Sequence, residues 1–169
     1  MRNAYSENVM EHSWEVATIA HALALIKNHY FGGTLDANQV ATAALYHDVT
    51  EIITGDLPTP IKYHSAAIQQ AFTTIEQTAA EALLQLLPAA MYQDFQPLLQ
   101  GALTQDMLDI LKMADKISAY LKCQAELAAG NQEFQIAATE LRQKIQQSPL
   151  QEVAYFMATF APNGGLPLD

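Results

Sequence analysis

The sequence is poor in several features on which whole classes of protein depend. Cys123 is the only cysteine among 169 residues, which excludes an intrachain disulfide and a metal cluster built on several thiolates. Eight Lys and Arg stand against eighteen Asp and Glu, giving a formal net charge of −10, so binding along a nucleic-acid polymer is not expected. No apolar run approaches the roughly 20 residues of a membrane span, and the polar residues 1–13 do not resemble a signal peptide. We therefore expect a cytoplasmic protein with neither a nucleic-acid polymer nor a membrane as partner.

The chain is nevertheless rich in the material that builds a core. Half of its residues are hydrophobic and only 15% are charged, which suits one folded domain of this length. We expect that domain to cover residues 1–160, with 161–169 as a flexible C-terminal tail. Cys123 lies in a helical pattern and is interpreted as a small core residue and not as a nucleophile.

Helix start and stop signals recur along the chain and predict an all-α fold of about six or seven helices. Asn8 and Glu11 form a capping-box pattern ahead of an apolar stripe from Val16 to Ile26. Asp36 opens a second helix, which is expected to run through His47-Asp48 and to end at Gly55. Two prolines indicate a loop at 56–60, and no stretch has the period-two alternation of a strand. Further helices are expected at 65–87, 88–100, 104–130, 133–147 and 149–160.

Titratable side chains concentrate around the His47-Asp48 doublet. Glu51 follows His47 by four residues and Asp48 by three, so the three would share one face of a continuous helix. The Gly55-Asp56 turn adds a further acid. Two interpretations remain open for this cluster alone, a functional site and a solvated helix end.

His12 and Asp115 lie on the apolar stripes of two other predicted helices. His12 shares its stripe with Val16, and the alternative to a ligand role is a core histidine bonded to a carbonyl. Asp115 shares its face with Leu111 and Ser118, where an acid is costly unless it is paired or bound to a metal. The alternative for Asp115 is an ion pair with a lysine such as Lys112.

Together, His12, His47, Asp48 and Asp115 make a mixed nitrogen and oxygen ligand set without a thiolate. Such a set suits one divalent ion, Co, Mn, Mg, Ni, Fe or Zn, better than Cu(I). Four protein ligands leave an octahedral ion room for a water and a substrate oxygen, and a bound cation lowers the pKa of water. The set is therefore suited to the hydrolysis of a phosphate ester.

The order His12, His47-Asp48, Asp115 resembles the H…HD…D pattern of the HD superfamily of helical metal-dependent phosphohydrolases. The strings ENVMEHSWEVA, AALYHDVTEIITGDLPTPIKY and MADKISAYLKCQAELAAGN are similar to its bacterial 5′-deoxynucleotidase branch, the YfbR-like family. The likeness covers the chain from Arg2 to about Phe160. It implies a single HD-type helical domain, metal-dependent hydrolysis of deoxyribonucleoside 5′-monophosphates, and a homodimer. The Ala-rich stretch 119–129 is a candidate dimer surface, and the alternative for this stretch is that it belongs to the core.

The resemblance also implies roles for single residues. The four residues of the ligand set would bind the metal, and Glu51 would be the catalytic residue that orients or deprotonates the attacking water. Asp56 would contact the substrate and take part in catalysis, and His12 and Asp115 would also contact the substrate. The stretch Gln100–Thr104 falls where the family has a substrate-facing loop.

Members of that family carry a further segment, with an Arg-Trp pair that helps to hold phosphate and base, ahead of the point that matches Met1. Trp14 is not the counterpart of that tryptophan, because it follows the first predicted ligand. We expect the difference to affect substrate orientation and turnover and to leave the metal site unchanged. Few basic residues are expected near the motifs, and Lys62 could either meet a phosphate or lie exposed.

Three alternatives to a nucleoside monophosphatase remain open from the sequence. The first is another HD-type phosphohydrolase: a triphosphatase, a cyclic phosphodiesterase or an alarmone hydrolase. The second is a catalytically impaired helical metal-binding domain. The third is a helical scaffold in which the acidic cluster is purely structural, and only this one should be indifferent to removal of metal.

Overall fold

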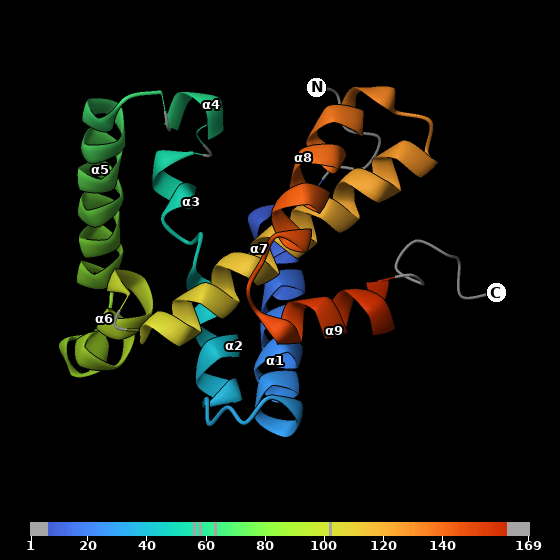
Figure 1. The fold of residues 1–169 in the computed structure, drawn as a ribbon. Coiled ribbons are helices and arrows are strands. Elements are labelled where there is room, and N and C mark those ends of the chain that lie inside the picture. Colours follow the sequence, from blue (N-terminus) through green and yellow to red (C-terminus); the bar gives the residue numbers. More distant parts are fainter. Residues whose placement is uncertain (1–6, 56, 58, 63, 102, 162–169) are drawn as a thin grey trace.

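The computed structural model describes residues 7–55, 57, 59–62, 64–101 and 103–161, and within them the protein is helical throughout (Figure 1). These residues form nine α-helices and two 3-10 helices and contain no strand. Two of the nine, α3 and α4, have only four residues each, so seven longer helices remain, as predicted. The elements in chain order are α1 Val9–Tyr30, α2 Ala37–Tyr46, α3 Glu51–Thr54, α4 Thr59–Lys62, α5 Ala66–Gln85, η1 Ala89–Met91, α6 Tyr92–Gln100, α7 Gln105–Ala128, η2 Gln132–Phe134, α8 Gln135–Gln146 and α9 Gln151–Thr159.

The helix starts follow the caps predicted from the sequence. The N–H of Glu11 donates to the side chain of Asn8, and the N–H of Asn8 donates back to Glu11, at 3.0 and 3.1 Å. Asp36, Ser65 and Thr104 each cap the next helix by accepting a backbone N–H. These bonds satisfy donors that a helix leaves open in its first turn.

The main core lies where α1 crosses α7 at the centre of the molecule (Figure 1). The predicted stripe of α1 is buried there, with Val16 and Leu23 fully inaccessible. α2 and α9 pack against α1, and Ile110 and Ile117 of α7 close the core from the other side. The site described below depends on this crossing, because α1 and α7 each contribute side chains to it.

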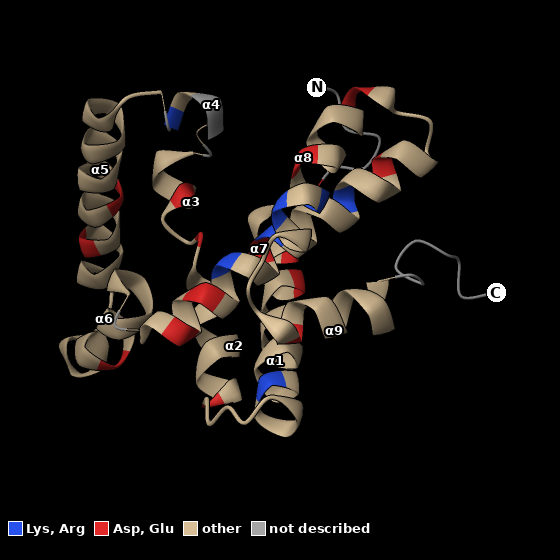
Figure 2. Cartoon of the chain, viewed as in Figure 1, with Lys and Arg blue, Asp and Glu red and all other residues tan. Residues whose placement is uncertain are grey.

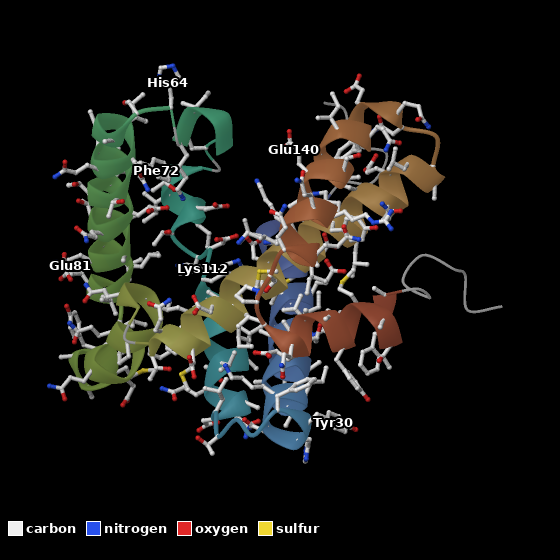
Figure 3. The ribbon with its side chains drawn as sticks, in the orientation of Figure 1. Tyr30, His64, Phe72, Glu81, Lys112 and Glu140 are labelled. Atoms are coloured by element: carbon white, nitrogen blue, oxygen red, sulfur yellow. The ribbon has the colours of Figure 1, made fainter. Side chains whose placement is uncertain are left out.

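A separate group of helices, α3 to α6, lies beside this core (Figure 1). Phe72 is buried and points from α5 toward α3 and α4 (Figure 3). The ammonium of Lys62, on α4, lies 4.7 Å from the centre of that ring and pairs with Glu76 at 2.8 Å. Lys62 is therefore not simply an exposed lysine, since these contacts hold α4 on α5.

A small second cluster joins the far half of α7 to α8. Cys123 is buried there beside Phe134 and Ala138, which confirms its interpretation as a core residue. Burial raises the pKa of the Cys123 thiol above its ordinary value, and a protonated thiol is a poor nucleophile.

Two predictions about the backbone near the doublet were wrong. The helix that begins after Asp36 does not continue to Gly55, because residues 47–50 form a turn between α2 and α3. The cause is local: His47 Nδ1 lies 2.7 Å from the carbonyl oxygen of Ala44, so the histidine side chain takes an acceptor that the helix would otherwise use. The second error concerns the loop at 56–60, since Thr59 and Pro60 begin α4, where a proline in the first turn costs no hydrogen bond.

Among the described residues, no helix is long and apolar enough to cross a membrane. The predicted tail at 161–169 lies outside the described residues except for its first position.

Candidate metal centre

The four predicted ligands come from three separate parts of the fold and meet at one point. His12 is in the first turn of α1, His47 and Asp48 are in the turn after α2, and Asp115 is in the middle of α7. His12 Nε2 lies 3.4 Å from Asp48 Oδ2 and 3.3 Å from Asp115 Oδ1. The centroids of the His12 and His47 rings are 5.4 Å apart. One ligand atom from each of His12, His47 and Asp115 falls within 4.8 Å of the others, a spacing that one metal ion can bridge.

The environment of His47 indicates that a cation belongs in the cluster. Its Nδ1 faces the Ala44 carbonyl, which can only accept, so Nδ1 carries the proton and Nε2 of the neutral ring presents a lone pair. That Nε2 is buried and has no hydrogen-bond partner among the described residues, although Asp48 Oδ2 lies 3.1 Å away. A lone pair and a carboxylate oxygen at this distance repel each other unless a proton or a metal ion lies between them. The residues present therefore fit a divalent metal.

His12 is oriented by a short chain of polar groups on its other side. The hydroxyl of Ser118, buried on α7, donates to Glu15 Oε2 at 2.5 Å. The Ser118 oxygen lies 3.4 Å from Nδ1 of His12. There it can accept the proton that Nδ1 carries in one tautomer of the neutral ring, which leaves the lone pair of Nε2 for a metal. The helical period predicts that Ser118 shares a face with Asp115, but it gives no signal for the role of Glu15, one turn after His12.

The carboxylates of the cluster strongly influence the protonation of its histidines. In the metal-free protein the neighbouring Asp115 and then Asp48 raise the pKa of His12 to about 10. For His47, burial acts to lower the pKa, but Asp48 outweighs it and the net shift is upward. Burial likewise opposes ionisation of Asp48, yet the two histidines hold the pKa of this carboxyl below its ordinary value. Without a metal, protons therefore occupy the place of the cation.

The cluster opens into a pocket of about 720 Å³ between two groups of helices. Its lining residues come from α1, the turn after α2, α3, α4, α7 and α8, and from residues outside the helices. Glu51 begins α3, where it donates its N–H to the carbonyl of Asp48, so the turn at 47–50 places it beside the cluster even though the predicted continuous helix is absent. The described residues that line this pocket are Glu7, His12, Asp48, Glu51, Leu57, Lys62, Asp115, Lys116, Ala119, Lys122, Leu141 and Lys144.

The prediction that few basic residues lie near the motifs was wrong. Most of the basic residues drawn in Figure 2 lie on α7 and α8, and Lys116, Lys122 and Lys144 from these helices line the pocket together with Lys62. Lys122 follows Asp115 by seven residues, or about two helical turns, which is a signal that the sequence contains. Lys144 is on another helix and carries no such signal.

Several predicted features take other positions. Asp115 is not buried in an inward stripe, since 48% of its side chain is exposed, and its partner is His12 and not the exposed Lys112. Gln100 and the described residues up to Thr104 do not line the pocket. Gln100 instead donates to Glu81 on α5. Asp56 lies outside the described residues.

Two solved structures share the fold of this chain. An HD-domain phosphohydrolase from Listeria innocua matches with a TM-score of 0.82 at 23% identity, covering 96% of this chain and 79% of that one. The cyanophage S-2L HD phosphohydrolase, described as bound to dA and one catalytic Zn²⁺ ion, matches with a TM-score of 0.67 at 23% identity, covering 96% of this chain and 86% of that one. The fold is that of the HD-domain phosphohydrolases.

Sequence comparison places the chain within that class. The family model described as 5′-deoxynucleotidase YfbR-like matches residues 1–164. The 5′-deoxynucleotidase yfbR of Photorhabdus temperata is 48% identical over 170 residues, covering all of this chain and 86% of that protein. The 5′-deoxynucleotidase YfbR of Salmonella typhi is 47% identical and is covered to 85%. The chain belongs to the 5′-deoxynucleotidase YfbR-like family.

Proposed function

We propose that this protein hydrolyses deoxyribonucleoside 5′-monophosphates to a deoxyribonucleoside and phosphate in a metal-dependent reaction. Membership of the YfbR-like family over the whole chain supports the reaction. The observation that supports the site is the buried Nε2 of His47, which has no described hydrogen-bond partner and faces the Asp48 carboxylate in a cluster of four potential ligands.

In this proposal His12, His47, Asp48 and Asp115 hold one divalent ion. The donor set of two imidazoles and two carboxylates suits Co, Mn, Mg, Ni, Fe or Zn. When bound, such an ion neutralises charge on the phosphate and lowers the pKa of water. The Ala44 carbonyl and the Ser118 hydroxyl fix the two rings, so that both Nε2 atoms point into the cluster.

Glu51 is the group proposed to handle the proton of the attacking water. It lines the pocket beside Asp48 and is supplied by a different element from the ligands on α1 and α7. Its carboxylate would accept a proton as the water attacks phosphorus in line with the 5′-oxygen of the sugar. His12 and Asp115, at the base of the pocket, would also contact the phosphate of the substrate.

We also propose that the protein is a homodimer that uses the Ala-rich stretch 119–129. One face of this stretch is committed within the chain, because Ala119 lines the pocket and Cys123 packs against α8. Ala125, Ala128 and Ala129 are exposed and remain available. Light scattering coupled to size exclusion tests the proposal, and a mass of one chain of 18.6 kDa would overturn it.

The reaction is tested by phosphate release from nucleoside mono-, di- and triphosphates, with Co²⁺, Mn²⁺, Mg²⁺ or Zn²⁺ added to metal-stripped protein. Metal-dependent turnover of deoxyribonucleoside monophosphates is expected, and Asp48→Ala should abolish it. Asp109→Ala is the matched control, since Asp109 is an acid on α7 that bonds Gln105 and does not line the pocket. Turnover of triphosphates in preference to monophosphates would contradict the proposal. Stoichiometric metal binding without any turnover would indicate the impaired metal-binding domain.

A further inference from the structure

Four of the six lysines of this acidic chain line one pocket, which three of the four proposed metal ligands, His12, Asp48 and Asp115, also line. Lys116 and Lys122 come from α7, Lys144 from α8 and Lys62 from α4. Ala119, three residues from each of Lys116 and Lys122 along α7, also lines the pocket. In a protein with a net charge of −10, this gathering of cations implies an anion as their partner.

Two of these lysines already have partners in the fold. Lys62 pairs with Glu76 at 2.8 Å, outside the pocket. Lys122 pairs with Glu7, which precedes α1. Lys116 and Lys144, by contrast, form no ion pair with any residue in the described part of the chain. These two ammonium groups are available to a ligand.

The charges on the wall of the pocket indicate the charge of that ligand. Among the described lining residues there are four carboxylates and four ammonium groups, which cancel. A divalent cation held by the four proposed ligands would leave the pocket with an excess of two positive charges. A phosphate monoester or inorganic phosphate carries about two negative charges near neutral pH, and so matches that excess, whereas a triphosphate would exceed it.

We propose that Lys116 and Lys144 bind the phosphate group of the substrate in the pocket that Glu51 also lines. Lys116 follows the proposed ligand Asp115 directly in α7, and both residues line the pocket. Lys144 approaches from α8 and meets the same anion as a second point charge. This inference rests on the proposed function and specifies how that site distinguishes a monophosphate from larger anions.

The test measures steady-state kinetics and product inhibition in the metal-loaded full chain. Lys116→Met, Lys144→Met and the double variant keep a long side chain without the charge. The matched control is Lys112→Met, an exposed lysine one turn before Lys116 on α7 that does not line the pocket (Figure 3). Each single variant should raise both KM for a deoxyribonucleoside monophosphate and Ki for inorganic phosphate by about tenfold, with kcat changed by less than about threefold.

Metal affinity should be unchanged in all of these variants, because no lysine belongs to the ligand set. Lys116→Arg should restore KM to near the wild-type value, a result that a purely structural role would not produce. Values of KM and Ki within about twofold of wild type in the double variant would overturn the inference and leave the proposed reaction untouched.

The proposed reaction can also fail while the proposed lysine site stands. If the wild-type chain turns over no nucleotide, calorimetric titration of the metal-loaded protein with inorganic phosphate still measures the anion site. Binding that is lost in the double variant and kept in Lys112→Met would support the lysine site while the proposed reaction fails. Equal phosphate binding in wild type and double variant would overturn the lysine site.

Discussion

Replacement of Ser118 by alanine tests whether the polar chain behind His12 controls the metal site. Ser118 is buried, and its hydroxyl connects Glu15 of α1 to Nδ1 of His12, the ring nitrogen that faces away from the cluster. Alanine removes that oxygen with little change in volume. The His12 ring then loses the acceptor for its Nδ1 proton, so the ring can turn or adopt the other tautomer, in which Nε2 is protonated and cannot bind a metal.

The expected loss of metal affinity follows from these contacts. Groups that orient a metal-binding histidine are typically worth about 10- to 100-fold in affinity. The other three ligands remain in place, and Asp48 and Asp115 still lie within 3.4 Å of His12. We therefore expect the affinity for the metal to fall by about tenfold, or about 1.4 kcal/mol of binding free energy. Loss of the bond to the Glu15 carboxylate should also destabilise the metal-free fold by about 1.5–3 kcal/mol.

The assay is a competition titration of metal-stripped protein against a chromophoric chelator, with unfolding followed in parallel. Ser148→Ala is the matched control, because Ser148 accepts the N–H of Leu150 and does not line the pocket of the cluster. It should lose some stability without any loss of metal affinity. Glu15→Gln, which keeps an acceptor of similar shape, should cost less affinity than Ser118→Ala. The effects of the two substitutions should not add, since both act on one chain of groups.

A folded Ser118→Ala protein that binds metal as tightly as wild type would refute this reasoning. His12 would then be held by its contacts with Asp48 and Asp115 alone. A loss of the same size in Ser148→Ala would also refute it, because the effect would then reflect general destabilisation.

Three further predictions concern the same cluster. Glu51→Gln should lower kcat by at least about a hundredfold and leave metal affinity unchanged, as measured by phosphate release and metal titration. A metal ion at about a hundred times its Kd should stabilise the fold by about 2.7 kcal/mol. For a domain of this size, calorimetry should then show a Tm higher by about 5–11 °C. The Asp48→Ala variant should show no such rise in Tm. Metal binding at pH 7.5 should release about one proton, because the adjacent carboxylates raise the pKa of His12 to about 10 and the metal needs the neutral ring. Affinity should therefore increase with pH up to that value, by about tenfold per pH unit, and calorimetry in buffers of different ionisation enthalpy measures the released proton.

The helices were predictable because their signals are local. Asn8 and Thr104 mark helix starts by short-range bonds to backbone that the sequence shows directly, and the apolar stripe of α1 needs only the helical period. The turn at 47–50 was not predictable in the same way. It depends on the His47 side chain competing for the Ala44 carbonyl, and the sequence permits that bond without requiring it.

The candidate site also contains residues that were predictable from local signals and contacts that were not. His47 and Asp48 are neighbours in sequence, and Asp115 lies on a helix face that the period reveals. The meeting of Ser118 with Glu15, 103 residues apart, depends on how α7 crosses α1. The position of Lys144 depends on how α8 packs on α7. Such contacts are set by tertiary packing, so a single sequence carries no direct signal for them.

The distance along the chain between the ligands has a kinetic consequence. His12 and Asp115 are more than one hundred residues apart, and the cluster exists only where α1 has crossed α7. The metal therefore cannot organise an early folding nucleus, because closing so long a loop first would be unfavourable. Interactions that form after the folding transition state slow unfolding without speeding folding. The bound metal should therefore slow unfolding, which prolongs the lifetime of the folded protein and protects it from proteolysis. It should leave the rate of folding nearly unchanged.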